Sequence, residues 1–256
     1  IPASMLFLLT IIGFAVKLPV FPLHTWLPDA HTDAPTAASV MLAGVLLKMG
    51  GYGMLRILAS MFPNELHQFA WMIALLGTIN IIYGAVITIR QTDLKRLIAY
   101  SSVSHMGFVL LGLSAASGAG AKIGITGASM QMFTHGTITG LLFLTIGFMY
   151  DRTHTRYIPD LSGLAQNTPI IATGLIVAGL ASLGLPATSG FIAEITIFLG
   201  AFQTWPIFTS ISASLFRQYD NRIAIIFVVW LVTRSLTPRG CKRIVACASV
   251  FFSHPS

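Results

Sequence analysis

Several apolar runs in the sequence reach about twenty residues, and this feature restricts the possible folds more than any other. A helix needs ~20 apolar residues to cross a hydrocarbon core of ~30 Å. Because that core contains no water, the backbone must form its own hydrogen bonds, which favours helices. A transmembrane barrel would instead show alternating segments of ~10 residues, and the sequence has no such pattern. The apolar runs therefore predict an all-α, polytopic transmembrane helical bundle.

The composition agrees with a membrane protein and excludes most soluble functions. Hydrophobic residues make up 55% of the chain and charged residues 9%, whereas about a quarter of the residues in a soluble domain are charged. The formal charge is +7, but the basic residues are scattered at the expected helix ends, so no nucleic-acid partner is expected. Cys241 and Cys247 lie near the end of the sequence and indicate no disulfide framework.

Six membrane spans are predicted from the positions of the apolar runs. They cover residues 4–22, 35–57, 69–89, 97–113, 123–149 and 169–202, and a shorter apolar run covers residues 223–232. The bundle is assigned to residues 1–208, and residues 209–256 are expected to form a divergent basic tail. The first residues show no basic segment typical of a signal peptide, and the chain is expected to be part of a longer protein.

The distribution of basic residues predicts how the bundle is oriented. Five basic residues are expected on one side of the membrane: Arg90, Lys95, Arg96, Arg152 and Arg156. The opposite side has only Arg56 and Lys122. Since Lys and Arg are enriched in cytoplasmic loops, the side with five basic residues is predicted to face the cytoplasm or the equivalent organellar compartment.

Two of the predicted spans are each interrupted by a cluster of helix-breaking residues. The clusters are Lys17-Leu18-Pro19 in the first span and Gly184-Leu185-Pro186 in the sixth. Paired broken helices are typical of internally repeated transporters, whose binding sites lie at the breaks. The alternative is two unrelated proline kinks, which membrane helices tolerate.

Three ionisable residues are predicted to lie near the middle of the membrane. At ~1.5 Å per residue, Lys48, His105 and His135 lie ~20, ~12 and ~18 Å along their spans, and the midplane of a ~30 Å core is at ~15 Å. A lysine at that depth costs about 3 kcal/mol. Lys48 is therefore either half of a structural ion pair or a protonatable group with a function. The two histidines are either hydrogen-bonded packing residues or parts of a proton path.

Two further ionisable residues, Lys17 and Glu194, lie beside the two helix breaks. A break exposes backbone groups that can hold water or an ion within the membrane. For Lys17 the alternative is an anchor at the membrane interface.

Other charged and polar residues are expected outside the spans. His24, Asp29, His31 and Asp33 are assigned to a polar loop over residues 24–33, as surface or gating residues. Asp93 with Lys95 and Arg96 is expected to form a solvated turn. The sequence shows no metal-ligand cluster, phosphate-binding loop or nucleotide fingerprint.

Several segments resemble the antiporter-like membrane subunits of respiratory complex I. They are Phe14–Pro19, Pro22–His31, Ala34–Gly50, Asp93–Gly107, Tyr150–Arg156 and Leu185–Glu194, and the similarity covers about residues 4–208. The segment around His105 is similar to subunit M, also called subunit 4, because relatives of the subunit 5 type usually lack a histidine at this place. The resemblance stops near Thr209.

The resemblance implies a proton-translocating membrane-arm subunit of an NADH-quinone oxidoreductase. It implies no redox centre, cofactor or metal in this chain, whereas NADH, FMN, iron–sulfur clusters and quinone are expected in partner subunits. The implied partners are the other membrane subunits of complex I, the lipid bilayer and protons. The implied location is a bacterial inner membrane, with a thylakoid or mitochondrial inner membrane as alternatives.

The resemblance also implies an order for five residues in a proton path. Lys17 would be the lysine at the first broken helix, Lys48 the central lysine, His105 and His135 the continuation of the polar axis, and Glu194 the acid at the second broken helix. In the family an acidic residue on an earlier helix pairs with the first lysine, and this helix has no counterpart here. Two rival interpretations are a subunit of a multi-subunit sodium/proton antiporter and a truncated, non-functional fragment.

Overall fold

The computed structural model describes residues 2–161 and 168–215, and the regular elements in these residues are helical. The elements are α1 (Ala3–Lys17), α2 (Trp26–Asp33), α3 (Thr36–Met41), η1 (Leu42–Leu46), α4 (Leu47–Gly53), η2 (Met54–Leu58), α5 (Ala59–Met61), α6 (Pro63–Ile89), α7 (Leu94–Ser114), η3 (Ala115–Ser117), α8 (Ala121–Thr153), η4 (Ile158–Asp160), α10 (Pro169–Ser182) and α11 (Ser189–Thr204). A further apolar helix covers Pro206–Leu215. The prediction of an all-α bundle is confirmed.

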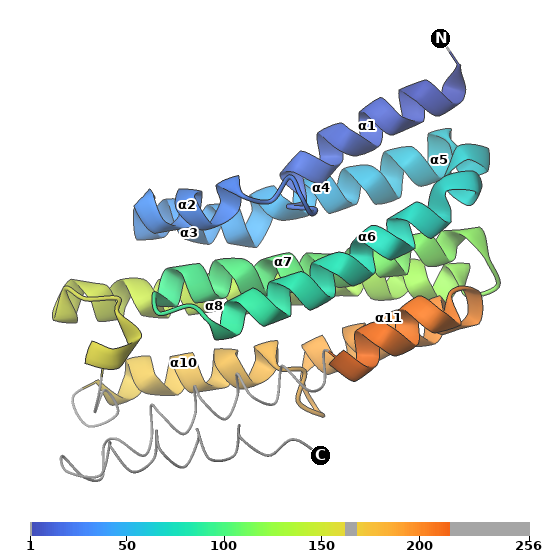
Figure 1. Ribbon diagram of the computed structural model, residues 1–256. Coiled ribbons are helices and arrows are strands. Elements are labelled where there is room, and N and C mark those ends of the chain that lie inside the picture. The colour runs from blue at the N-terminus through green and yellow to red at the C-terminus, as the bar shows by residue number, and fades with distance from the viewer. Residues whose placement is uncertain (1, 162–167, 216–256) are drawn as a thin grey trace, which may run out of the picture.

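Four continuous helices are long and apolar enough to cross a membrane, and they lie roughly side by side in Figure 1. They cover Thr36–Met61, Pro63–Ile89, Leu94–Ser117 and Ala121–Thr153, with 24 to 33 residues each. At ~1.5 Å per residue each of them exceeds the ~30 Å of a hydrocarbon core. The first combines α3, η1, α4, η2 and α5, so two short π-helical segments interrupt its regular hydrogen bonding.

The centre of the bundle is α7, whose residues are nearly all buried between α6, α8 and α11. Small residues allow the close approach of α6 and α7. A Cβ atom on Gly107 would lie 2.7 Å from the carbonyl oxygen of Gly77, which is closer than packed atoms can approach. Membrane helices often associate through such small residues, because no hydrophobic effect drives them together within lipid. This contact lies about half a helical turn along α7 from His105 and fixes the position of His105 along the axis of the bundle.

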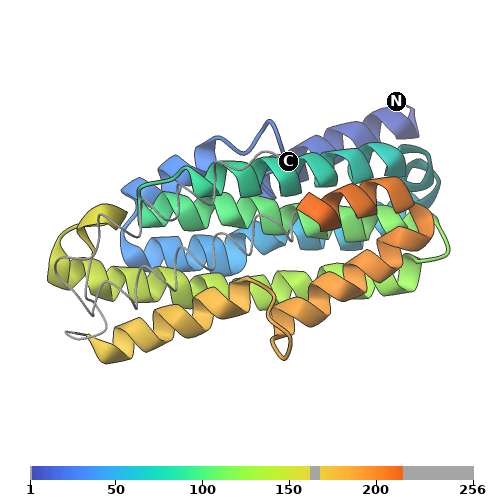
Figure 2. The same ribbon diagram turned by 60° about the horizontal axis from the view of Figure 1, so that its bottom comes forward.

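The two predicted broken helices are confirmed. The first consists of α1 and α2, separated by residues 18–25, and the second of α10 and α11, separated by residues 183–188. Figure 1 shows α1 and α2 on one edge of the bundle beside the helix Thr36–Met61. Figure 2 shows the loop between α10 and α11 leaving the line of its two helices.

The prediction of a polar loop over residues 24–33 is wrong in its second part. Residues Trp26–Asp33 form α2, in which Pro28 occupies the first turn, a position where a helix tolerates proline. The extended residue Ala34 before Pro35 ends the helix. Nor are the two histidines of this region at the surface, because His24 is 2% exposed and His31 0%.

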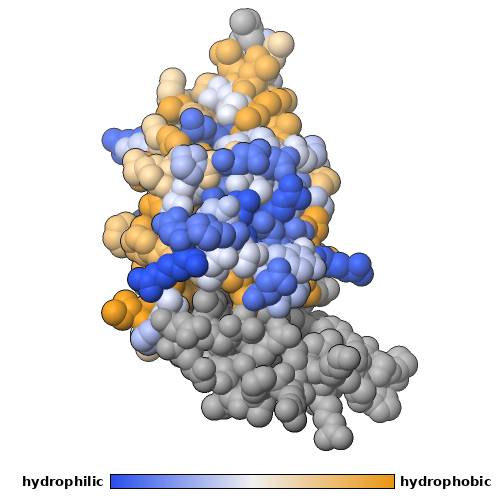
Figure 3. All heavy atoms as spheres, turned by 90° about the vertical axis from the view of Figure 1, so that its left-hand side faces the viewer, coloured by the Kyte–Doolittle hydropathy of each residue, from blue (hydrophilic) through white to orange (hydrophobic). Residues whose placement is uncertain are grey.

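The predicted solvated turn at Asp93 is correct for the backbone but wrong for one side chain. Asp93 caps α7 by accepting hydrogen bonds from the backbone N–H groups of Lys95 and Arg96, at 2.8 and 3.2 Å. Lys95, however, is 5% exposed. Figure 3 shows this end of the bundle as a hydrophilic face between apolar flanks. The basic residues that predict the cytoplasmic side belong to segments that meet at this end (Figure 1).

The proposed division of the chain at residue 208 stays a prediction. Residues 209–215 belong to the apolar helix Pro206–Leu215, where Ser212 Oγ hydrogen-bonds to Thr78 Oγ1 of α6 at 3.3 Å. The apolar run over residues 223–232 and the rest of the basic tail lie outside the described residues.

Candidate functional site

The first helix break ends α1 at Lys17, and two backbone N–H groups and one side chain satisfy the carbonyl groups of its last turn. The last turn of α1 has carbonyl groups that lack partners within the helix. Leu18 N donates to Phe14 O at 2.8 Å and Val20 N to Ala15 O at 3.0 Å. The indole Nε1 of Trp26 donates to Val16 O at 3.0 Å. The break is therefore a defined structure and not a simple proline kink.

Asn80 of α6 holds the middle of this break, although its sequence context did not mark it as a functional residue. Its Oδ1 accepts a hydrogen bond from Phe21 N at 2.7 Å, and its Nδ2 donates to Pro19 O at 3.1 Å. The side chain is 0% exposed. One amide thus satisfies a backbone donor and a backbone acceptor that the interrupted helix leaves open, as irregular backbone at membrane depth requires.

Replacing Asn80 by alanine is expected to lower the free energy of unfolding by about 2 kcal/mol, because Pro19 O and Phe21 N would lose their partners in a buried site. The measurement is thermal unfolding of the purified protein in detergent. Asn64→Ala is the matched control, since Asn64 is exposed on the same helix. Equal shifts in the unfolding temperature for both variants would show that the hydrogen bonds of Asn80 do not stabilise the break.

Lys17 lies beside the helix that carries Lys48, but its own side chain is exposed on the described chain. A Cβ atom on Gly50 would lie 2.9 Å from Leu18 N and 3.1 Å from Lys17 Cβ. Only glycine allows the end of α1 to approach so closely. The first break is thereby fixed two residues from Lys48, while the side chain of Lys17 stays exposed.

Lys48 is half-buried at the start of α4, directly after the π-helical segment η1. Its Nζ donates to the carbonyl oxygen of Ala43, which lies within η1. π-helical turns often occur at functional sites. Among the described residues no carboxylate oxygen lies within 4 Å of Lys48 Nζ, so the structural ion pair has no partner in this part of the chain. On the neighbouring helix, a Cβ atom on Gly136 would lie 3.5 Å from Lys48 Cε.

His135, directly before Gly136 on α8, lies beside His105 of α7. It is 3% exposed, and its ring centroid is 5.3 Å from that of His105. Neither ring nitrogen of His135 has a hydrogen-bond partner among the described groups. Gln131, one turn earlier on α8, contacts His105 through Nε2 and Nδ1 at 3.3 Å. Both histidines therefore lie in the interior and not at the lipid surface.

Glu194 of α11 completes this group at the second helix break. It is 6% exposed, and its Oε1 is 3.7 Å from His105 Nδ1. Gly184 in the break has a φ of +61°, a conformation that favours glycine. A Cβ atom on Gly184 would touch Glu194 Oε2 and lie 3.3 Å from the carboxyl carbon. Because residue 184 is glycine, the break leaves space for the Glu194 carboxylate; a side chain at position 184 would fill this space.

His105, His135 and Glu194 line a small cavity with several hydroxyl groups in its wall. Its lining consists of Ser101, His105, Gln131, Thr134, His135, Ile138, Thr139, Ala181, Ser182, Gly190 and Glu194. We call Lys48, His135, His105 and Glu194 the polar axis. The structure brings these four predicted residues together from four separate helices, and leaves the fifth, Lys17, at the edge.

His31 is a buried residue of α2, whereas the polar segment around it predicted an exposed side chain. Its ring stacks on Phe143 of α8 with centroids 4.4 Å apart, and neither ring nitrogen has a hydrogen-bond partner among the described groups. It lies one turn after Leu27 on α2, and Leu27 packs with Leu47, the neighbour of Lys48. A helical register that places His31 beside the buried Leu27 and Pro28 is the signal that could have revealed it.

In the part of the chain that the structure describes, no three His, Cys, Asp or Glu side chains are grouped as a metal site would require. The arrangement offers imidazole, carboxylate, ammonium and hydroxyl groups, which can accept and pass protons.

The chain is similar to known membrane proteins. The family model described as NADH:quinone oxidoreductase/Mrp antiporter, TM matches residues 1–217. NADH-quinone oxidoreductase subunit M of Rickettsia prowazekii is 49% identical over 192 residues, which are 75% of this chain and 38% of that protein. NAD(P)H-quinone oxidoreductase chain 4 2 of Thermosynechococcus vestitus is 52% identical over 190 residues, or 74% of this chain and 35% of that protein. The chain therefore spans well under half the length of these relatives.

Solved structures show the same fold. A chain of respiratory complex I from Thermus thermophilus matches with a TM-score of 0.82 and 31% identity over 96% of this chain and 52% of that one. A chain of the Mrp complex from Dietzia has a TM-score of 0.79 and 24% identity over 89% of this chain and 42% of that one, which shows the fold alone. Because the family model matches most of the length of this chain, the chain belongs to the NADH:quinone oxidoreductase/Mrp antiporter transmembrane family.

Proposed function

We propose that this chain is part of a proton-translocating membrane subunit of an NADH-quinone oxidoreductase, of the subunit M type. The observation that carries the proposal is the polar axis, in which Lys48, His135, His105 and Glu194 follow one another across four helices within the apolar bundle. The similarity to subunit M and chain 4 relatives supports the assignment. NADH, FMN, iron–sulfur clusters and quinone would be held by partner subunits.

Proton transfer along the axis requires groups that change protonation state and bridges between them. Imidazole and carboxylate groups can do this, and a lysine in a low-dielectric site changes charge readily. Water bonded to the buried hydroxyl groups and to the ring nitrogens of His135 would bridge the remaining gaps, since buried polar groups commonly bond to water. His31 is proposed as a further carrier, because it is buried, its ring stacks on Phe143 of α8, and its helix packs through Leu27 on Leu47, the neighbour of Lys48. Moving each proton against the membrane potential costs ~2.3 kcal/mol per 100 mV, which the redox reaction would supply.

A multi-subunit cation/proton antiporter is the second candidate, because the family description and a solved relative both include Mrp antiporters. The test uses sealed vesicles that contain the assembled complex with this chain and a pH-sensitive dye. The proposal expects proton translocation when NADH and quinone are added, and its loss with a protonophore. Proton movement driven by a sodium gradient without NADH would favour the antiporter.

Replacing His105 or His135 singly by alanine is expected to lower the rate of proton translocation several-fold without abolishing it, because water can substitute for one ring in a hydrated path. The measurement is the initial rate of dye quenching in the same vesicles, relative to the amount of assembled complex. His67→Ala is the control, since His67 is exposed on α6. A wild-type rate for either axis variant would remove that residue from the path.

A further inference from the structure

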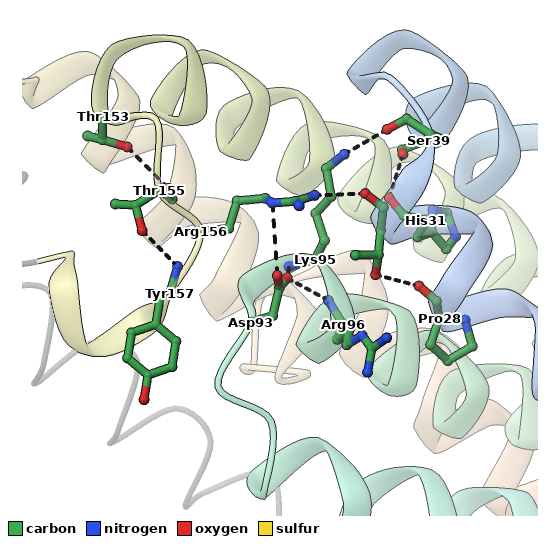
Figure 4. A network of polar contacts seen from close by, with 12 residues as sticks. Pro28, His31, Ser39, Asp93, Lys95, Arg96, Thr153, Thr155, Arg156 and Tyr157 are labelled. Carbon is green, nitrogen blue, oxygen red and sulfur yellow. Dashed lines mark hydrogen bonds and ion pairs between the residues drawn. The ribbon is translucent and has the colours of Figure 1, made fainter.

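The C-terminal end of α2 is held by hydrogen bonds from three other elements. The last carbonyl groups of a helix have no partners within it. Ser39 Oγ of α3 donates to His31 O at 3.2 Å, Arg156 Nη1 donates to Thr32 O at 2.8 Å, and Lys95 Nζ donates to Ala34 O at 2.8 Å. Figure 4 shows these side chains converging on the end of α2. Two of the three donors are cations, which the dipole of a helix favours at its C-terminus.

Arg156 connects this end of α2 to two other parts of the bundle. Its Nε lies 3.9 Å from Asp93 Oδ2, the residue that caps α7, and its guanidinium carbon lies 5.2 Å above the ring of Tyr150 on α8. The backbone is also paired here, because Leu94 N donates to Arg156 O and Ile158 N to Thr92 O. Arg156 therefore holds a fixed position between α2, α7 and α8 and is not a mobile surface cation (Figure 4).

Lys95 makes the second connection from inside the bundle. A buried lysine is costly unless it has partners, and Lys95 is 5% exposed with its Nζ on the carbonyl group that ends α2. The more exposed pair Arg96–Asp29, at 3.0 Å, reinforces the same contact between α7 and α2 from outside.

The held helix packs against residues that neighbour the polar axis in the sequence and in the bundle. Leu27 of α2 packs with Leu47, the neighbour of Lys48, and with Val103 of α7, and all three are buried. One turn further on, the ring of His31 stacks on Phe143 of α8. Movement of the end of α2 would therefore shift His31 relative to Lys48.

We propose that Lys95 and Arg156 are positioning residues that hold the C-terminal end of α2 and thereby keep the ring of His31 in place beside the polar axis. This inference rests on the proposed function of the axis in proton transfer. The two cations act through His31 and carry no proton themselves in this scheme. Without them the end of α2 would open toward the hydrophilic face of Figure 3.

The test compares Lys95→Gln and Arg156→Gln with Arg152→Gln in the assembled complex. Arg152→Gln is the matched control, because Arg152 is exposed near the end of α8 and its replacement removes the same charge from the same end of the bundle. Hydrogen–deuterium exchange of the amides of residues 31–34 and 36 is expected to become about tenfold faster in the first two variants and unchanged in the control. Arg156→Lys, which keeps the charge, is expected to restore part of the protection.

A second readout separates positioning from general stability. Lys95→Gln is expected to slow NADH-driven proton translocation several-fold, but to have no further effect when His31 is already alanine, because residues that act through one another are not additive. Unchanged exchange in residues 31–34 and 36, or an equal slowing in both backgrounds, would overturn the inference. The exchange result does not depend on transport, so absence of NADH-driven pumping in wild-type vesicles would refute the proposed function and leave the anchoring of α2 separately tested.

Discussion

Replacing Lys48 by alanine is expected to lower NADH-driven proton translocation by about 100-fold, the loss typical of removing a positioned proton donor or acceptor. Lys48 is the only ammonium group of the polar axis among the described residues, and it follows a π-helical segment whose Ala43 carbonyl it bonds. Alanine retains the helix but supplies no protonatable group. Water alone would then have to carry a proton between His135 and whatever lies beyond Lys48.

The rate is measured in vesicles with equal amounts of assembled complex. Lys122→Ala is the control, because it removes an exposed lysine at the opposite end of the bundle from the hydrophilic face. Lys48→Arg serves as a second variant: it retains the charge but does not release a proton readily. It is therefore expected to translocate as poorly as Lys48→Ala, which would exclude a role of Lys48 as a fixed charge.

Replacing Glu194 by glutamine is expected to lower proton translocation by about tenfold or more, because the amide has nearly the same size but cannot carry the proton. The carboxylate lies 3.7 Å from His105 and against Gly184 in the second helix break. Glutamine fits this space, so the fold is expected to be retained. The variant removes the carboxylate that would accept a proton beside His105.

The matching control is Glu65→Gln, which changes the same group in the first turn of α6. Thermal unfolding of both variants verifies that the bundle is intact. If Glu194→Gln translocates protons at the wild-type rate, Glu194 is a structural residue of the break and the axis ends at His105.

The sequence predicted much of the fold because its constraints are local. Apolar runs of about twenty residues dictate helices in a membrane, and the clusters at Lys17-Leu18-Pro19 and Gly184-Leu185-Pro186 mark both breaks. The helix α2 was missed because its polar residues suggested a solvated loop. Its carbonyl groups are satisfied by Lys95 and Arg156, which are 61 and 124 residues away in the sequence. Such partners cannot be recognised from local composition.

The candidate site could be predicted only in part, for similar reasons. The depth of Lys48, His105 and His135 in their spans identified them, because a charged group or a polar ring inside a span costs free energy and usually has a function. Asn80 gave no such signal, since one uncharged amide in an apolar helix is common, and its two partners lie about sixty residues earlier. The π-helical segment before Lys48 has no sequence signature either.

The number of protons translocated per NADH oxidised, in vesicles that hold the assembled complex with Lys48→Ala, tests the central claim most directly. Normalising to NADH oxidised separates transport from the supply of electrons. The polar axis predicts that this number falls below that of the Lys122→Ala control. The wild-type number of protons per NADH in the Lys48→Ala complex would contradict the account.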